Sequence, residues 1–252
     1  MTKFLIKNKK TLVWVTISLL LVICLILANY ISLLILKTDN KSDEVTNPEV
    51  EIYMLSLSKS KLQNEAKSIA PDYQKIGAGG YIWKQDDYFY VISSAYINKN
   101  DAELVKNSIK INQDIDSEII TVKFPYFSIN GSFNADKKKV VSKAIAIAQT
   151  FYTSIYDIAV SLDTGVNSEI NSKLAVNSTS NTISTIYANF DTLYPNPLTS
   201  PLKELSNFIK KVVSISNKLA IDERPNKNQT YSSHLKLRYL EALACYYDYI
   251  TA

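Results

Sequence analysis

Cysteine and histidine are scarce in this 252-residue chain, which contains two cysteines and one histidine. Cys24 falls in a long apolar run and Cys245 lies near the end, so no disulfide is expected within the chain. The sequence has no HExxH, CxxC or glycine-rich phosphate-loop motif, and His234 is expected to be a solvated residue in the first turn of the last helix. We therefore expect no metal site, no cofactor and no enzymatic activity.

Acidic residues are absent before Asp39, whereas four lysines, Lys3, Lys7, Lys9 and Lys10, precede residue 11. These lysines account for the whole formal net charge of +4, because the other 24 basic residues equal the 24 acidic ones in number. The chain beyond residue 10 is therefore formally neutral and has no net positive charge to attract a polyanion. Nucleic acid is therefore not expected as a partner.

Charge is also absent from Thr11 to Leu36, a run in which aliphatic residues dominate. About 20 apolar residues cross a bilayer, so residues 11–36 are predicted to form a transmembrane helix. The alternative is a cleaved signal peptide, but the run is too long and lacks a small-x-small cleavage site. The lysines at positions 1–10 indicate a cytoplasmic N-terminus and place the chain from residue 37 onward outside the cell membrane.

The rest of the chain changes character twice. Residues 37–48 are polar and end on Pro48, which is typical of a stalk. Residues 49–128 alternate strand-like and helix-like patterns and are expected to fold independently. Residues 135–252 predict a bundle of about four helices, at Asp136–Leu162, Ser168–Phe190, Leu202–Leu219 and Ser232–Tyr249.

A strand-then-helix pattern occurs twice between Val50 and Ile111, and Ile119–Phe124 is available as a closing strand. A glycine-rich entry at positions 77–80 precedes a short strand, and Asp86-Asp87 is typical of a turn into the next strand. The predicted fold class is therefore α+β: a transmembrane helix, a small βαββαβ split sheet, then a helical bundle. Two helices should cover one face of the sheet and leave the other face open.

These residues resemble the SPOR (sporulation-related repeat) family over roughly residues 50 to 124. The resemblance is carried by Tyr53–Ser58 before Glu65-Ala66, by Phe89–Tyr96 before Asp101-Ala102-Glu103, and by a middle strand at Gly79–Lys84. Serine replaces the family's usual glycine at positions 58 and 94. The single anchor and helical tail are similar to those of clostridial membrane-anchored SPOR proteins. The resemblance implies binding of peptidoglycan glycan strands that lack stem peptides.

The candidate glycan-binding residues follow from the family positions and from strand alternation, and they are Ser56, Tyr81, Trp83, Tyr90 and Ile92. Aromatic rings suit the mixed polar and apolar surface of a sugar. The alternative is that these side chains belong to a core covered by the C-terminal helices. In that case the chain is a protein-interaction scaffold whose helical tail binds a membrane or divisome partner. A wall-lytic enzyme using paired aspartates is a weaker alternative, because these aspartates lie in turn-like sequence.

Overall fold

The computed structural model describes residues 44–196 and 200–252. The predicted cytoplasmic segment 1–10, transmembrane helix 11–36 and first part of the stalk, residues 37–43, lie outside the described residues. Residues 44–252 form one compact unit by their contacts.

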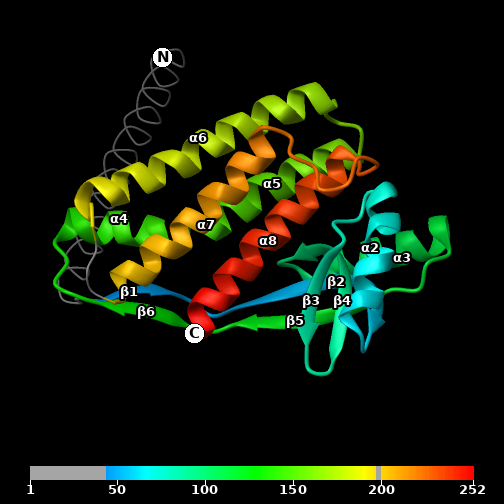
Figure 1. The fold of residues 1–252 in the computed structure, drawn as a ribbon, viewed down its shortest axis with the longest axis horizontal. Coiled ribbons are helices and arrows are strands. Elements are labelled where there is room, and N and C mark those ends of the chain that lie inside the picture. The colour runs from blue at the N-terminus through cyan, green and yellow to red at the C-terminus, as the bar shows by residue number, and fades with distance from the viewer. Residues whose placement is uncertain (1–43, 197–199) are drawn as a thin grey trace, which may run out of the picture. The chain divides into compact units, whose positions relative to one another are not determined.

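The repeated strand-helix pattern forms a four-stranded antiparallel sheet. Its strands are β2 (Val50–Ser60), β3 (Tyr81–Gln85), β4 (Tyr88–Tyr96) and β5 (Glu118–Phe124), in the spatial order β3-β4-β2-β5. Helices α2 (Gln63–Lys75) and α3 (Lys99–Gln113) connect the strands and pack on one face of this sheet (Figure 1). The predicted βαββαβ arrangement is confirmed.

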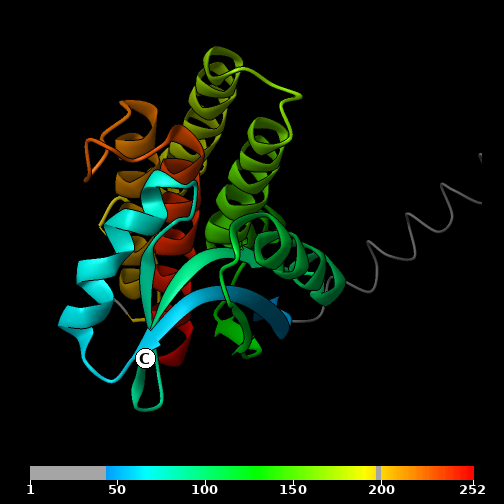
Figure 2. The same cartoon turned by 90° about the vertical axis from the view of Figure 1, so that its right-hand side faces the viewer.

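Local signals explain the boundaries of these elements. Asp86, with φ of +53°, and Asp87 form the two-residue connection between β3 and β4, as expected from the sequence. The Asn98 side chain accepts a hydrogen bond from the amide of Asn100 and caps α3, and Asp114 ends this helix in the left-handed region with φ of +52°. The turn of the β3–β4 hairpin projects beyond the helices in both views (Figures 1 and 2).

Part of the predicted stalk forms a second, two-stranded sheet. Glu44–Asn47, assigned to the stalk from its polar sequence, instead forms strand β1, which pairs antiparallel with β6 (Phe127–Asn130). Val45 and Ile129 are buried in the main core, which explains why this short polar segment is ordered. Only one apolar side chain in β1 points inward, so the sequence signal was weak.

The C-terminal part contains one helix more than expected in the described residues. The predicted helix at 136–162 is two helices, α4 (Ala135–Ile145) and α5 (Ile147–Asp163), bent by 50° at Ala146. No proline or glycine marks this bend. Three helices follow near the predicted positions: α6 (Glu169–Leu193), α7 (Leu202–Ala220) and α8 (Tyr231–Thr251). Within residues 44–196 and 200–252, no single helix could cross a bilayer, and only α4 and α5 taken together satisfy the length and composition.

The helical part covers the second face of the four-stranded sheet, so the expectation of an open face is wrong. Helix α8 contacts β3 and β4 and also packs on α5 and α7 (Figure 1). One core joins the two parts, because Met54 and Ile92 from the sheet cluster with Phe151 of α5 and Tyr239 of α8. The expectation for His234 is also wrong: it is fully buried, since α8 begins inside the bundle.

Candidate functional site

The structure separates the five predicted glycan-binding residues into two groups. Ser56, Trp83 and Ile92 are buried, with exposed fractions of 1%, 7% and 0%. Tyr81 and Tyr90 are half-buried and contact the edge of the same core. Strand pairing places Tyr81 beside Ile92 and Trp83 beside Tyr90 on one face, as strand alternation predicts. The predicted residues therefore share a face, but α8 covers most of it.

Two contacts explain how α8 reaches the sheet. Trp83 packs edge-on against Tyr247 of α8, with ring centroids 5.3 Å apart. The Tyr239 hydroxyl accepts a hydrogen bond of 3.3 Å from the amide of Ala95 in β4. Gly79 permits the close approach, because a Cβ atom there would lie 2.8 Å from the Leu240 Cδ1 atom and 3.0 Å from the Ser93 carbonyl oxygen. These contacts fix the sheet and the bundle as one body.

The end of the sheet face near the β3–β4 hairpin carries a second group of aromatic side chains. We call Tyr88, Tyr90, Lys59 and Lys61 the tyrosine end. Tyr88 and Tyr90 are both half-buried, with ring centroids 6.3 Å apart. Lys59 pairs with Tyr90 across the strands, and its Nζ atom lies 5.5 Å from the centre of the Tyr88 ring. The Nζ atom of Lys61 lies 5.9 Å from the same ring.

This arrangement suits a ligand that is apolar on its faces and polar at its edges. The ring faces offer flat apolar area, and the lysine ammonium groups offer hydrogen-bond donors beside them. One ion pair limits the local charge, because Lys59 Nζ lies 3.5 Å from a carboxylate oxygen of Glu118. Tyr88 is not among the residues predicted from the sequence, although its position two residues before Tyr90 places it on the same face of β4.

Tyr81 lies apart from the tyrosine end, against α8. Burial, and then the carboxylate of Asp248, raise the pKa of Tyr81 to about 12. Its hydroxyl is therefore neutral and able to donate a hydrogen bond at any physiological pH. Glu241 and Cys245 of α8 also act on it electrostatically. Burial raises the pKa of the Cys245 thiol, which argues against a reactive thiolate.

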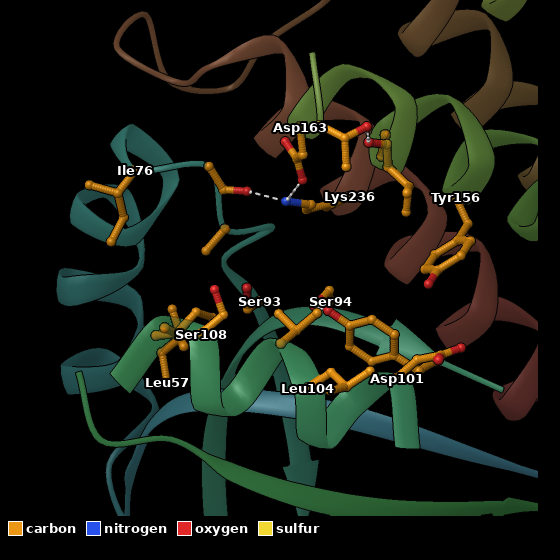
Figure 3. A pocket seen from close by; sticks show the side chains of 18 of the residues that line it. Leu57, Ile76, Ser93, Ser94, Asp101, Leu104, Ser108, Tyr156, Asp163 and Lys236 are labelled. Atoms are coloured by element: carbon orange, nitrogen blue, oxygen red, sulfur yellow. Dashed lines mark hydrogen bonds and ion pairs between the residues drawn. The ribbon is translucent and has the colours of Figure 1, made fainter. Parts of the chain in front are cut away.

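A cleft lies on the opposite side of the sheet, between α3 and the ends of α5 and α8 (Figure 3). Its volume is about 530 Å³, in the range of ligand-binding clefts. The floor includes Leu57, Ser93 and Ser94 of the central strands. These positions adjoin the irregular pairing of β2 with β4, where the register shifts on both sides of Ser56.

The wall formed by α5 and α8 is fixed by polar contacts. Lys236 of α8 forms an ion pair with Asp163 of α5 at 2.6 Å and donates a hydrogen bond of 2.9 Å to the Gly77 carbonyl oxygen (Figure 3). Ser232 donates a hydrogen bond to Asp163, and Ser233 donates one to the Ala78 carbonyl oxygen. The loop after α2 is thereby held against the first turns of α8.

Neither the tyrosine end nor the lining of the cleft contains a histidine or a cysteine. Among the described residues, no cluster of three histidine, cysteine, aspartate or glutamate side chains could hold a metal ion. Burial, and then the positive charge of Arg238, lower the pKa of His234 to about 4, and this side chain lies inside the bundle away from both surfaces. Both surfaces are suited to binding.

No protein-family model and no curated protein matches the chain. Among solved structures, the chain is weakly similar to the solution structure of the peptidoglycan-binding domain of the Bacillus subtilis cell wall lytic enzyme CwlC. The sequence identity is 21%, the match covers 29% of this chain and 90% of that domain, and the TM-score is 0.25.

Proposed function

We propose that this chain is a bacterial membrane-anchored protein that binds peptidoglycan glycan strands outside the cell membrane through the tyrosine end. It catalyses no reaction. Binding localises or tethers the protein at sites of wall remodelling, in division or sporulation. The single observation that carries this proposal is the pair of half-exposed rings, Tyr88 and Tyr90, 6.3 Å apart beside two lysines on the part of the sheet face beyond α8.

The charge of the body favours this mode of binding. Beyond residue 10 the chain is formally neutral, so bulk attraction to an anionic wall polymer is weak. Retention on the wall then requires ring contacts and hydrogen bonds to sugar. Stem peptides would obstruct such contacts, which explains why stripped glycan should be preferred.

The predicted transmembrane helix determines where the protein would act. Residues 11–36 hold the chain in the membrane, and the four lysines before them keep the N-terminus in the cytoplasm. A reporter enzyme that needs an oxidising, external environment should therefore be active when fused after Ala252. Activity of a cytoplasm-specific reporter at that position would overturn both the topology and the wall proposal.

The ligand is tested with two forms of one wall preparation. Full-length chain in non-ionic detergent should cosediment with purified peptidoglycan, and more strongly after an amidase removes the stem peptides. Equal or weaker retention on the stripped wall would contradict glycan recognition.

A second candidate function is a protein-interaction scaffold that binds a membrane or divisome partner through the helical part. The covered sheet favours this candidate, because Trp83 and Ile92 serve the core. The two functions use different surfaces and can be tested separately.

A further inference from the structure

We propose that the cleft between α3 and the ends of α5 and α8 binds a segment of a partner protein in which a basic side chain is followed by an apolar one. This inference rests on the scaffold function and is independent of glycan binding, because the cleft lies on the α2–α3 side of the sheet, opposite the face of Tyr90.

The basic side chain would enter the aromatic part of the cleft. Tyr96 of β4 and Tyr156 of α5 meet edge to face there, with ring centroids 5.9 Å apart. Asp101 of α3 lines the same part of the cleft as these two rings (Figure 3). Burial raises the pKa of both tyrosine hydroxyls, so both stay neutral. Aromatic rings beside a carboxylate attract an ammonium or guanidinium group.

The charges around the cleft favour a cationic ligand. Asp163 is neutralised by Lys236 at 2.6 Å and accepts a further hydrogen bond from Ser232. Asp101, in the first turn of α3, has no ion-pair partner among residues 44–196 and 200–252. A negative charge is favoured at this helix terminus, and Asp101 lines the cleft together with Tyr96 and Tyr156.

The apolar side chain would lie at the mouth of the cleft. Ile76, Leu104 and Val160 come from three different helices or their ends, line the cleft, and have exposed fractions of 48%, 68% and 42%. Leu57 and Val105 continue this apolar surface inward. Figure 3 shows Ile76 and Leu104 at separate sides of the hollow, with Asp101 beyond Leu104.

A peptide fits the aromatic part and the apolar mouth of the cleft better than a sugar does. Three exposed aliphatic side chains provide apolar area without the flat ring faces and dense donors that sugars need. The volume of about 530 Å³ holds a few side chains of an extended segment. Helix α3 packs on the sheet through Ala102, Val105 and Ile109, whereas its Leu104 remains exposed at the cleft and available to a partner.

The probe is a pair of blocked tripeptides, acetyl-Leu-Lys-Leu-amide and the same peptide with norleucine in place of lysine. Full-length chain with labelled Ile, Leu and Val methyl groups, in detergent micelles, is titrated with each peptide by NMR. The lysine peptide should shift the methyl signals of Leu104 and Ile76. The norleucine peptide should bind about tenfold more weakly, because it lacks the charge-assisted contact.

Variants locate the contact. Asp101→Asn should reduce the affinity for the lysine peptide to that for the norleucine peptide, while leaving the latter unchanged. Asp116→Asn, at a side chain that is 93% exposed just beyond α3, is the matched control and should have no effect. The proposal is overturned by an absence of methyl shifts, by equal binding of the two peptides, or by equal binding to wild type and Asp101→Asn. Shifts at Leu104 caused by stripped glycan instead would make the cleft a sugar site.

Discussion

Trp83 on the edge strand β3 packs edge-on against Tyr247 near the end of α8, with ring centroids 5.3 Å apart. A ring that the sequence pattern offers as a binding group is therefore part of the contact between the sheet and the bundle. Trp83 also lies beside Tyr81, at 6.5 Å between ring centroids, so its removal would leave a cavity with several aromatic neighbours.

Removal of the Trp83 side chain should destabilise the fold. Trp83→Ala should lower the free energy of unfolding by about 3–5 kcal/mol, because the indole is almost fully buried. Chemical denaturation followed by circular dichroism measures the change. The control is Tyr126→Ala, at a ring that is 55% exposed, which should stay within about 0.5 kcal/mol of wild type. A similar small effect of Trp83→Ala would mean that α8 does not cover this part of the sheet.

Gly79 provides a second test of the same interface. Gly79→Val should be strongly destabilising, because even a Cβ atom there lies within 3.2 Å of the Leu237 amide nitrogen and closer still to the Ser93 carbonyl oxygen. Gly165→Ala is the control: its φ is +69° but nothing lies within 4 Å of the added carbon, so the loss should be about 1 kcal/mol. Thermal unfolding of both variants shows which loses more stability. A smaller loss for Gly79→Val than for Gly165→Ala would contradict close packing of α8.

His234 should make stability fall in mild acid. Burial lowers its pKa to about 4, below the usual value near 6.5 of an unfolded chain, so the unfolded state binds the proton first as pH falls. Stability should decrease through this range, by about 2 kcal/mol from pH 7 to pH 5. Arg238 and Arg224 oppose the imidazolium and Asp222 favours it.

The matched variant for this effect is His234→Met, which keeps an unbranched apolar side chain of similar length. The difference in unfolding free energy between wild type and His234→Met should change by about 2 kcal/mol between pH 7 and pH 5. A difference independent of pH would show that His234 is not buried in its neutral form.

The α+β part should not fold cooperatively by itself, contrary to the expectation from its sequence. A fragment of residues 48–128 would expose Met54, Trp83 and Ile92, which the helices bury in the whole chain. Calorimetry of this fragment should show no cooperative transition, whereas residues 44–252 should show one. A cooperative transition of the short fragment would mean that the bundle is an addition to a complete domain.

Local patterns in the sequence predicted the elements well, for identifiable reasons. The Asp86-Asp87 turn and the helical stripe of α7 each depend on neighbours in the chain, and each lies where expected. Strand alternation also assigned Tyr81, Trp83 and Tyr90 to one face. Such signals act over a few residues and can be read from one sequence.

What covers that face could not be predicted, because it depends on long-range packing. Alternation gives the same pattern for a ring facing water and for a ring facing another apolar layer. The contact of Gly79 with Leu240 joins residues 161 positions apart, and nothing near Gly79 indicates it. The ordering of β1 likewise depends on its pairing with the distant strand β6, and no proline or glycine marks the bend at Ala146.

The most direct test of the account is the loss of wall binding at the tyrosine end without loss of folding. Tyr88→Ala and Tyr90→Ala, in the full-length chain, should each weaken cosedimentation with amidase-stripped peptidoglycan by about 1–2 kcal/mol. Tyr126→Ala, at an exposed tyrosine outside the tyrosine end, should bind as wild type does, and all three variants should keep their circular dichroism. Normal binding by the Tyr88 and Tyr90 variants, or equal loss in Tyr126→Ala, would contradict glycan recognition by this surface.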